Sequence, residues 1–168
     1  DKVLLEYPRP QMRRNSYINL NGIWRYAIVR GERLPDKIDG EILVPFSPEC
    51  ELSGVHRTVG PEDTLWYVKN FSLPADFNIG RVLLHFGAVD QIAEVYLNGI
   101  EVGSHTGGYT PFSIDITREL REENQLIVKV RDVTDTSWHT RGKQKIRKGG
   151  IWYTPQSGIW QTVWLESG

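Results

Sequence analysis

The sequence feature that most constrains the fold is a series of short segments in which apolar side chains alternate with their neighbours. Successive side chains of a β-strand point to opposite faces of a sheet, so a two-residue period rich in Val, Ile, Tyr and Trp predicts strands. Helix is expected only as one or two turns within residues 116–123, with Asp115 or Thr117 as the cap. Alternating segments span residues 24–28, 65–73, 81–86, 92–97, 100–105, 112–116, 125–131 and 161–166. Eight or nine strands with almost no helix predict an all-β fold, an antiparallel β-sandwich.

One tight turn is predicted within this pattern. Asn98-Gly99 lies between the alternating runs Val95-Tyr96-Leu97 and Ile100-Glu101-Val102. A two-residue hairpin turn requires a positive φ at both central residues, which Asn and Gly tolerate better than other residues. The dipeptide therefore predicts a β-hairpin at residues 95–102.

The length and composition exclude several classes of protein. Residues 1–168 have the length of one domain with its own core and contain no linker. The net charge of -1 gives no general reason to expect nucleic acid or an anionic membrane as a partner, and no apolar run approaches the roughly 20 residues that span a bilayer. The single cysteine, Cys50, excludes an intrachain disulfide framework and a Cys-rich zinc site. Because the chain begins at Asp1 without a leader, we interpret it as a piece of a larger protein whose compartment, cytoplasmic, periplasmic or secreted, stays open.

Two long loops are the expected places for binding residues. They span residues 45–61 and 132–157, and loops of this length in a compact domain are usually functional or disordered. Asp132 and Asp135 are the preferred acidic candidates, because they directly follow a predicted strand that would hold them in place. An Asx turn is the structural alternative for Asp135. His139 is the one histidine that we consider for function, because it lies in the same loop beside an aromatic side chain.

The aromatic residues of the second loop allow two interpretations. The segment GGIWYTPQSGIWQTVWLE, residues 149–166, holds three of the six tryptophans. The rings of Trp138, Trp152 and Tyr153 are candidates for stacking on a sugar or for contact with another domain. Burial in the sandwich is the expected role of Trp24 and Trp66.

Other kinds of site have little support in the sequence. Residues 141–148 contain five basic side chains but no aromatic, which argues against a nucleic-acid surface that combines stacking with phosphate contacts. No phosphate-binding glycine motif and no metal-binding histidine spacing occur. No acid cluster clearly marks a calcium site. We therefore expect no cofactor, and the presence of a metal stays open.

Several motifs carry a resemblance to a known family. The central ones are FGAVDQIAEVYLNG at residues 86–99 and VGSHTGGYTPF at residues 102–112. Further motifs are RPQ at 9–11, LNGIW at 20–24, VPF at 44–46, LSG at 52–54, DIT at 115–117, NQL at 124–126 and SGIWQTVWL at 157–165. Taken in order, they cover nearly the whole chain, which resembles the N-terminal sugar-binding domain of glycoside hydrolase family 2. This group contains β-galactosidases, β-glucuronidases and β-mannosidases.

The resemblance implies a jelly-roll β-sandwich of the galactose-binding-like type, within a larger retaining exo-β-glycosidase. In the family, an immunoglobulin-like domain and a (β/α)8 barrel follow, and the barrel carries both catalytic glutamates, one of them after an asparagine. This chain contains no Asn-Glu dipeptide and is too short for a barrel of about 250 residues. We therefore expect no catalytic residue in it, and the implied partners are a β-linked glycoside and the two downstream domains.

The resemblance also implies substrate contacts. In β-galactosidases of the family, the loop that corresponds to residues 132–157 reaches the active site, where an aspartate contacts substrate hydroxyls. Asp135 is the aligned acid, and Asp132 remains the alternative because the alignment can slip there. Glu49 lies in a loop that matches a second family loop near the active site, although its residues depart from the family pattern. Trp152 and Tyr153 are expected to face the barrel.

Three functional hypotheses stay open at this point. The first is a domain that positions substrate and supports the catalytic barrel. The second is an autonomous carbohydrate-binding module that uses Trp138, Trp152 or Tyr153 as a stacking platform. The third is a purely structural domain that supports the barrel or a subunit interface. The glycone, the linkage and the oligomeric state are not fixed by the sequence.

Overall fold

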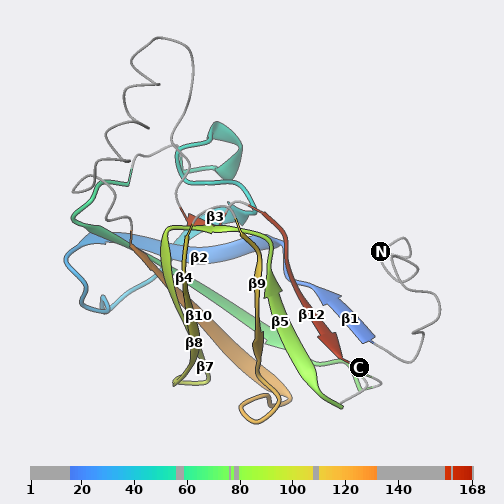
Figure 1. Cartoon of the computed structure of the whole chain (residues 1–168). Helices are drawn as coiled ribbons and strands as arrows, with labels where there is room; N and C mark the ends of the chain where they lie inside the picture. The colour runs from blue at the N-terminus through green and yellow to red at the C-terminus, as the bar shows by residue number, and fades with distance from the viewer. Residues whose placement is uncertain are drawn as a thin grey trace.

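The computed structural model describes residues 16–55, 59–75, 77, 80–107, 110–131, 158–159 and 161–167. Within these ranges the chain forms β-strands and one short 3₁₀ helix, η2 (Glu51–Ser53) (Figure 1). The strands are β1 (Ser16–Asn19), β2 (Gly22–Arg30), β3 (Gly40–Val44), β4 (Asp63–Ser72), β5 (Val82–Phe86), β6 (Val89–Asp90), β7 (Ile92–Leu97), β8 (Ile100–Thr106), β9 (Phe112–Asp115), β10 (Glu123–Arg131), β11 (Gly158–Ile159) and β12 (Val163–Ser167).

The strands form two large antiparallel sheets and one small one. The four-stranded sheet has the order β1-β12-β5-β9, and the six-stranded sheet has the order β3-β2-β4-β10-β7-β8. The short strands β6 and β11 pair with each other. The all-β class and the scarcity of helix are therefore confirmed for the described residues. The described part of the chain contains no helix with the length and apolarity needed to cross a membrane.

The two large sheets enclose one hydrophobic core, and the alternating sequence explains why. In β5, Val82, Leu84 and Phe86 are buried while the residues between them are only half-buried. In β4, Leu65 and Tyr67 are fully buried and belong to the same core as the buried residues of β5. A two-residue period thus places one face of each strand in the interior, where burying a large apolar side chain contributes roughly 1.5–3 kcal/mol.

The predicted hairpin joins β7 to β8. Asn98 and Gly99 have φ values of 53° and 87°, as a two-residue turn requires. The side chain of Asn98 also fixes the neighbouring chain, because its Nδ2 donates to the backbone oxygen of Glu119 at 2.8 Å and its Oδ1 accepts from the backbone N–H of Gln125 at 2.9 Å. The hairpin prediction is confirmed.

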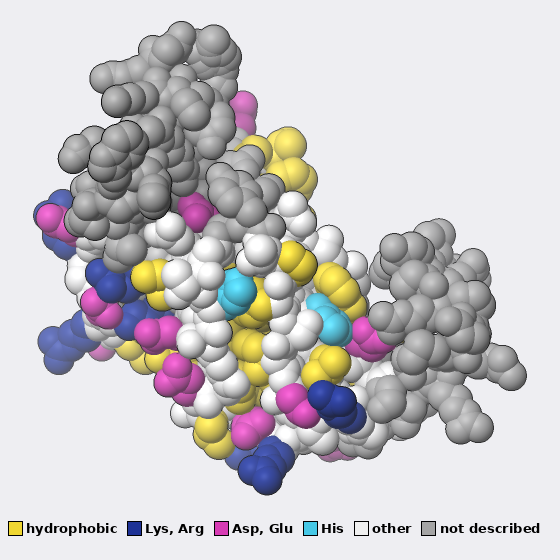
Figure 2. Space-filling model, in the orientation of Figure 1, with side chains coloured by type: hydrophobic (Ala, Val, Ile, Leu, Met, Phe, Trp, Pro, Cys, Tyr) yellow, Lys and Arg dark blue, Asp and Glu magenta, His cyan; other side chains and the backbone are white. Residues whose placement is uncertain are grey.

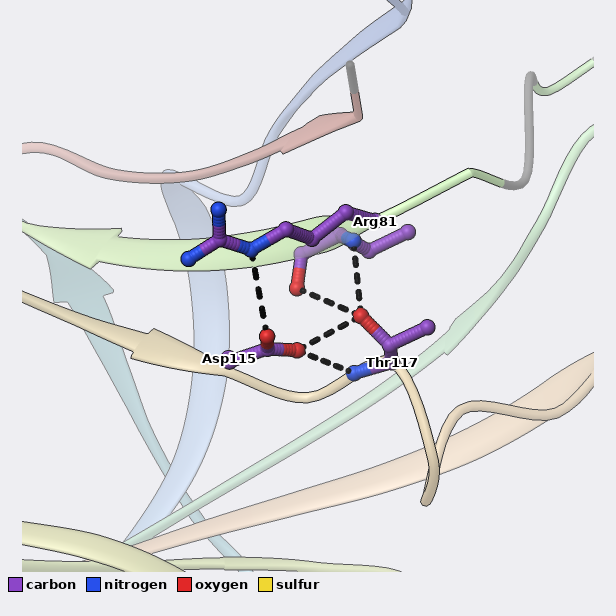
Figure 3. A network of polar contacts seen from close by, with 4 residues as sticks. Arg81, Asp115 and Thr117 are labelled. Atoms are coloured by element: carbon purple, nitrogen blue, oxygen red, sulfur yellow. Dashed lines mark hydrogen bonds and ion pairs between the residues drawn. The ribbon is translucent and has the colours of Figure 1, made fainter.

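Residues 116–120 form a single turn, in which the Leu120 N–H donates to the Ile116 oxygen at 3.1 Å, and β10 begins at Glu123. The Asp115 carboxylate accepts the backbone N–H of Thr117 at 3.0 Å, and Arg81 contacts the other carboxylate oxygen at 3.2 Å (Figure 3). The hydroxyl of Thr117 accepts the backbone N–H of Val82 at 2.9 Å, which ties the turn to the start of β5. Hydrogen bonds from Thr117, with Arg81 in a smaller role, lower the pKa of Asp115. Asp115 therefore acts as the expected cap, but the chain is bound to β5 before a second helical turn begins.

The tryptophans divide between the core and the outer faces of the sheets. Trp24 is 1% exposed and lies in the core, where its ring meets Tyr67 edge to face. Trp66 is also buried, but it points to the outer face of the six-stranded sheet, where the Lys129 ammonium lies 5.6 Å from its ring. Trp164 is half-buried on the outer face of the four-stranded sheet. The burial predicted for Trp24 and Trp66 is confirmed, although only Trp24 belongs to the core.

Candidate functional site

The structure bears directly on one of the seven predicted site residues. Glu49 is described, whereas the other six lie outside the described residues: Asp132, Asp135, Trp138, His139, Trp152 and Tyr153. The candidate site is therefore built from the described residues that border residues 132–157 and from the loop that holds Glu49.

The two described ends of this segment lie next to each other in the fold. β10 ends at Arg131, which pairs with Ile92 of β7, and β11 begins at Gly158, which pairs with Asp90 of β6. Only Gln91 separates β6 from β7. Because paired strands lie about 5 Å apart, residues 131 and 158 are at the same end of the sandwich. The sheets thus place both ends of the predicted binding loop at one location.

Glu49 is a buried acid held by backbone groups. Its side chain sits in the turns between β3 and η2, and the residue is only 7% exposed. One carboxylate oxygen, Oε2, accepts the backbone N–H of Val59 at 3.1 Å. A hydrogen bond of this kind offsets part of the cost of burying a charge. Glu49 therefore links the two ends of its own loop, and its proposed contact with substrate stays a prediction.

Tyr67 of β4 contacts the backbone of β11. The residue is fully buried, and its hydroxyl oxygen accepts the backbone N–H of Ile159 at 2.9 Å. Burial raises the pKa of Tyr67 well above its usual value, the hydrogen bond from Ile159 lowers it, and the charge of Glu49 raises it further. The hydroxyl therefore stays protonated over the whole physiological range. Both Tyr67 and Glu49 are buried.

Gly158 also contacts Tyr67. Its backbone lies so close to β4 that a side chain would not fit at this position. Its φ is +69°, in the region that favours glycine. A Cβ atom at this position would collide with the hydroxyl of Tyr67 and would lie 2.7 Å from Cδ2 of Leu65. The backbone of β11 therefore lies directly against β4. We name Tyr67, Asp90, Gly158 and Ile159 the loop-anchor cluster.

An unpaired acceptor lies beside the loop-anchor cluster. The side-chain oxygen Oε1 of Gln91 is buried and has no hydrogen-bond partner among the described residues. A buried polar atom left without a partner costs about 1–3 kcal/mol, and such atoms are found at functional sites. Sequence patterns did not single out Gln91, Tyr67 or Gly158. Of these three residues, only Tyr67 had a usable signal, because the hydroxyl of a buried tyrosine usually has a hydrogen-bond partner.

Two described acids that are next to a second acid in the sequence make contacts at the surface. Glu62, which precedes Asp63, contacts Arg30 at 3.1 Å, and Glu123, which follows Glu122, accepts from Ser72 at 2.7 Å. All four of these contacting residues are exposed. Within the described ranges no three His, Cys, Asp or Glu side chains are arranged to hold a metal ion.

Both described histidines contact neighbouring strands. His85 lies between Ser113 and Glu166, with Nδ1 2.6 Å from the serine hydroxyl and Nε2 3.1 Å from the carboxylate. His105 stacks on Phe112 with ring centroids 4.2 Å apart. Figure 2 shows histidine side chains in cyan near hydrophobic side chains on the face in view. The contacts of His85 and His105 lie within and between the sheets, which fits structural roles for both.

Comparison with known proteins identifies the family. The family model described as "Glycosyl hydrolase 2 galactose-binding domain-like" matches residues 40–160. A β-glucuronidase of Formosa agariphila is 36% identical over 62% of this chain, and a β-galactosidase of Thermoanaerobacter pseudethanolicus is 36% identical over 60% of it. These matches span only 11% and 13% of the two relatives.

A solved structure shows the same fold. The Faecalibacterium prausnitzii β-glucuronidase is similar over 91% of this chain and 31% of its own length, with a TM-score of 0.63 and 22% identity. At this identity the similarity concerns the fold alone. The family model extends over most of the chain and includes strands of both large sheets. The chain therefore belongs to the glycosyl hydrolase 2 galactose-binding domain-like family.

Proposed function

We propose that this chain is the non-catalytic N-terminal domain of a retaining exo-β-glycosidase. In this role it supports the catalytic barrel and contributes residues 132–157 to the positioning of the substrate. The observation that supports the proposal is that strand pairing brings residues 131 and 158, the two described ends of this segment, to one end of the sandwich. A pre-organised loop lowers the entropic cost of holding a sugar in a productive orientation.

The relatives support the class of substrate. They include β-glucuronidases and β-galactosidases, whose names specify β-linked glycosides. The resemblance assigns Asp135 to the hydroxyl contact, with Asp132 as the alternative. Such an aspartate orients the terminal sugar, while the two glutamates of the barrel carry out the two displacements of a retaining mechanism. The jelly-roll sandwich then serves as a rigid base for the loop.

Replacing Asp135 with alanine in the full glycosidase is expected to lower kcat/KM by about ten- to a hundredfold. The reason is the loss of a hydrogen bond between a charged group and the sugar, which is worth about 1.5–3 kcal/mol. Steady-state kinetics with a chromogenic β-glycoside measures the effect. Glu122→Ala is the matched control, because Glu122 is an exposed acid next to the first residue of β10, at the opposite end from Arg131.

Two results would contradict the proposal. One is an unchanged kcat/KM in both Asp135→Ala and Asp132→Ala, which would remove these acids from the substrate site. The other is calorimetric binding of a glycan to the 168-residue chain alone, with loss of binding in Trp152→Ala. That second result would favour the autonomous carbohydrate-binding module.

A further inference from the structure

We propose that Asn21 is a modification site of this domain, at which the side-chain amide is lost by spontaneous deamidation, whereas the hydrogen bonds of Asn98 protect the same group there. The chain contains two Asn-Gly dipeptides, Asn21-Gly22 and Asn98-Gly99. This inference does not depend on the proposed function, and the only reactant that it requires is water.

The chemistry of an Asn-Gly dipeptide makes it prone to this reaction. The backbone nitrogen of the glycine attacks Cγ of the asparagine and forms the C–N bond of a cyclic succinimide. The Cγ–Nδ2 bond breaks, and Nδ2 leaves as ammonia with the proton of the glycine amide. Water then opens the ring at either carbonyl and gives aspartate or isoaspartate. Glycine favours the attack because it has no Cβ that would hinder its nitrogen.

The two dipeptides have the same local surroundings. Each lies in the tetrapeptide Leu-Asn-Gly-Ile, at residues 20–23 and 97–100. Both asparagines are half-buried. A Cβ atom at either glycine would meet nothing within 4 Å, so neighbouring groups do not crowd the α-carbon of either glycine. A difference in their reactivity would therefore come from the contacts of the two side-chain amides.

The amide of Asn98 is held at both of its polar atoms. Its Nδ2 donates to the backbone oxygen of Glu119 at 2.8 Å and to Oδ1 of Asn124 at 3.0 Å. Its Oδ1 accepts the backbone N–H of Gln125 at 2.9 Å. Nδ2 is the leaving group of the reaction, and it has to give up both of its acceptors when Cγ turns toward the backbone.

The amide of Asn21 is held only at its carbonyl oxygen. Oδ1 accepts the backbone N–H of Val163 at 3.0 Å. Among the residues that the structure describes, Nδ2 of Asn21 has no acceptor. A donor on the carbonyl oxygen does not prevent the reaction, because it stabilises the negative charge that develops on this oxygen during the attack. Asn21 is therefore the more reactive of the two asparagines.

The two products at residue 21 differ in their effect on the fold. Aspartate keeps an oxygen that can accept from Val163. Isoaspartate moves the Cβ of residue 21 into the main chain and lengthens the connection between β1 and β2. This connection is bound closely to β12, because the Leu20 N–H also donates to the Val163 oxygen at 2.9 Å. We expect isoaspartate, but not aspartate, to detach this connection from β12.

The first test compares deamidation of the two asparagines in the 168-residue chain. The chain is incubated in a mildly alkaline buffer, with and without denaturing urea, and peptide mass spectrometry measures the deamidated fraction at each site. In urea we expect equal rates, because the tetrapeptides are identical. In the folded chain we expect Asn21 to react about tenfold faster or more, since two additional hydrogen bonds have to break at Asn98. Asn21→Gln is the control, which should remove the fast reaction and leave the rate at Asn98 unchanged.

The second test measures the effect of each product by amide hydrogen exchange. The isoaspartate form is separated by chromatography, and Asn21→Asp supplies the aspartate form. We expect the Val163 amide to exchange about tenfold faster in the isoaspartate form and at an unchanged rate in Asn21→Asp, because only the first loses its acceptor. The Gln125 amide, which Asn98 holds, is the internal control and should be unchanged in both.

Three results would overturn the assignment of Asn21. The first is deamidation of Asn98 in the folded chain at the rate of Asn21 or faster. The second is a folded chain that does not react at Asn21 while the chain in urea does. The third is a faster reaction of Asn21 that persists equally in urea, since the fold would then not be its cause. Equal Val163 exchange in the two product forms would contradict the structural effect of isoaspartate.

Discussion

Replacing Trp24 with alanine is expected to lower the free energy of unfolding by about 3–5 kcal/mol, the usual range for a large aromatic ring removed from a core. Trp24 is 1% exposed, and its indole N–H donates to the backbone oxygen of Leu20 at 2.7 Å. The substitution would remove this hydrogen bond, the edge-to-face contact with Tyr67 and most of the ring's buried surface. Urea unfolding of the 168-residue chain, followed by circular dichroism, measures the change.

Ile23→Ala provides the control for Trp24→Ala. Ile23 is the preceding residue of β2, but it points to the other face of the sheet and is 52% exposed. Surface substitutions of this kind usually change stability by less than about 0.5 kcal/mol. A loss below about 1 kcal/mol for Trp24→Ala would contradict the placement of Trp24 in the core.

Gly158→Ala is the second substitution with a large expected effect, a loss of about 2–4 kcal/mol. An alanine with a φ near +69° is strained by about 1 kcal/mol or more. Its methyl group would also meet the hydroxyl of Tyr67 and Cδ2 of Leu65, and overpacking of this kind costs about 1–3 kcal/mol. The same unfolding experiment measures the sum of the two effects.

Gly99→Ala separates these two effects. Gly99 has a φ of +87°, and a Cβ atom at its position would meet nothing within 4 Å. This variant is therefore expected to lose only the backbone contribution, about 1 kcal/mol. Equal losses for the two alanine variants would show that β11 is not packed tightly against Tyr67.

The parts of the fold that were predictable are those encoded by local patterns. The alternation within β4 identified which of its residues face the interior, and Asn98-Gly99 identified the hairpin. The strands β1, β3, β6 and β11 were not predicted, and the two-residue strands β6 and β11 are too short to show a period. β1 pairs with β12, and β6 pairs with β11, so these pairings depend on partners that are distant in the sequence. One of the one or two turns expected after Asp115 is present, and the side-chain bonds that tie it to Arg81 and Val82 are not contained in a local pattern.

The loop-anchor cluster illustrates why the candidate site was less predictable. Tyr67 and Ile159 are 92 residues apart in the chain, and only the folded sheet brings the hydroxyl to the backbone N–H. Glu49 looked like an acid of a surface loop, but it is buried. Its partner is the backbone N–H of Val59, and a backbone partner has no sequence signature. In contrast, Asp135 came from a family resemblance, and its contact with substrate remains a prediction.

The most direct test of the central claim is a crystal structure of the full glycosidase with an uncleaved β-glycoside bound. We expect a carboxylate oxygen of Asp135 within about 2.6–3.2 Å of a hydroxyl of the terminal sugar, the distance range of a hydrogen bond. We also expect the Ile159 N–H to donate to Tyr67 in that complex, as it does in this structure. A bound sugar with no atom of residues 45–55 or 132–157 within hydrogen-bond distance would contradict the claim that this domain helps to position the substrate.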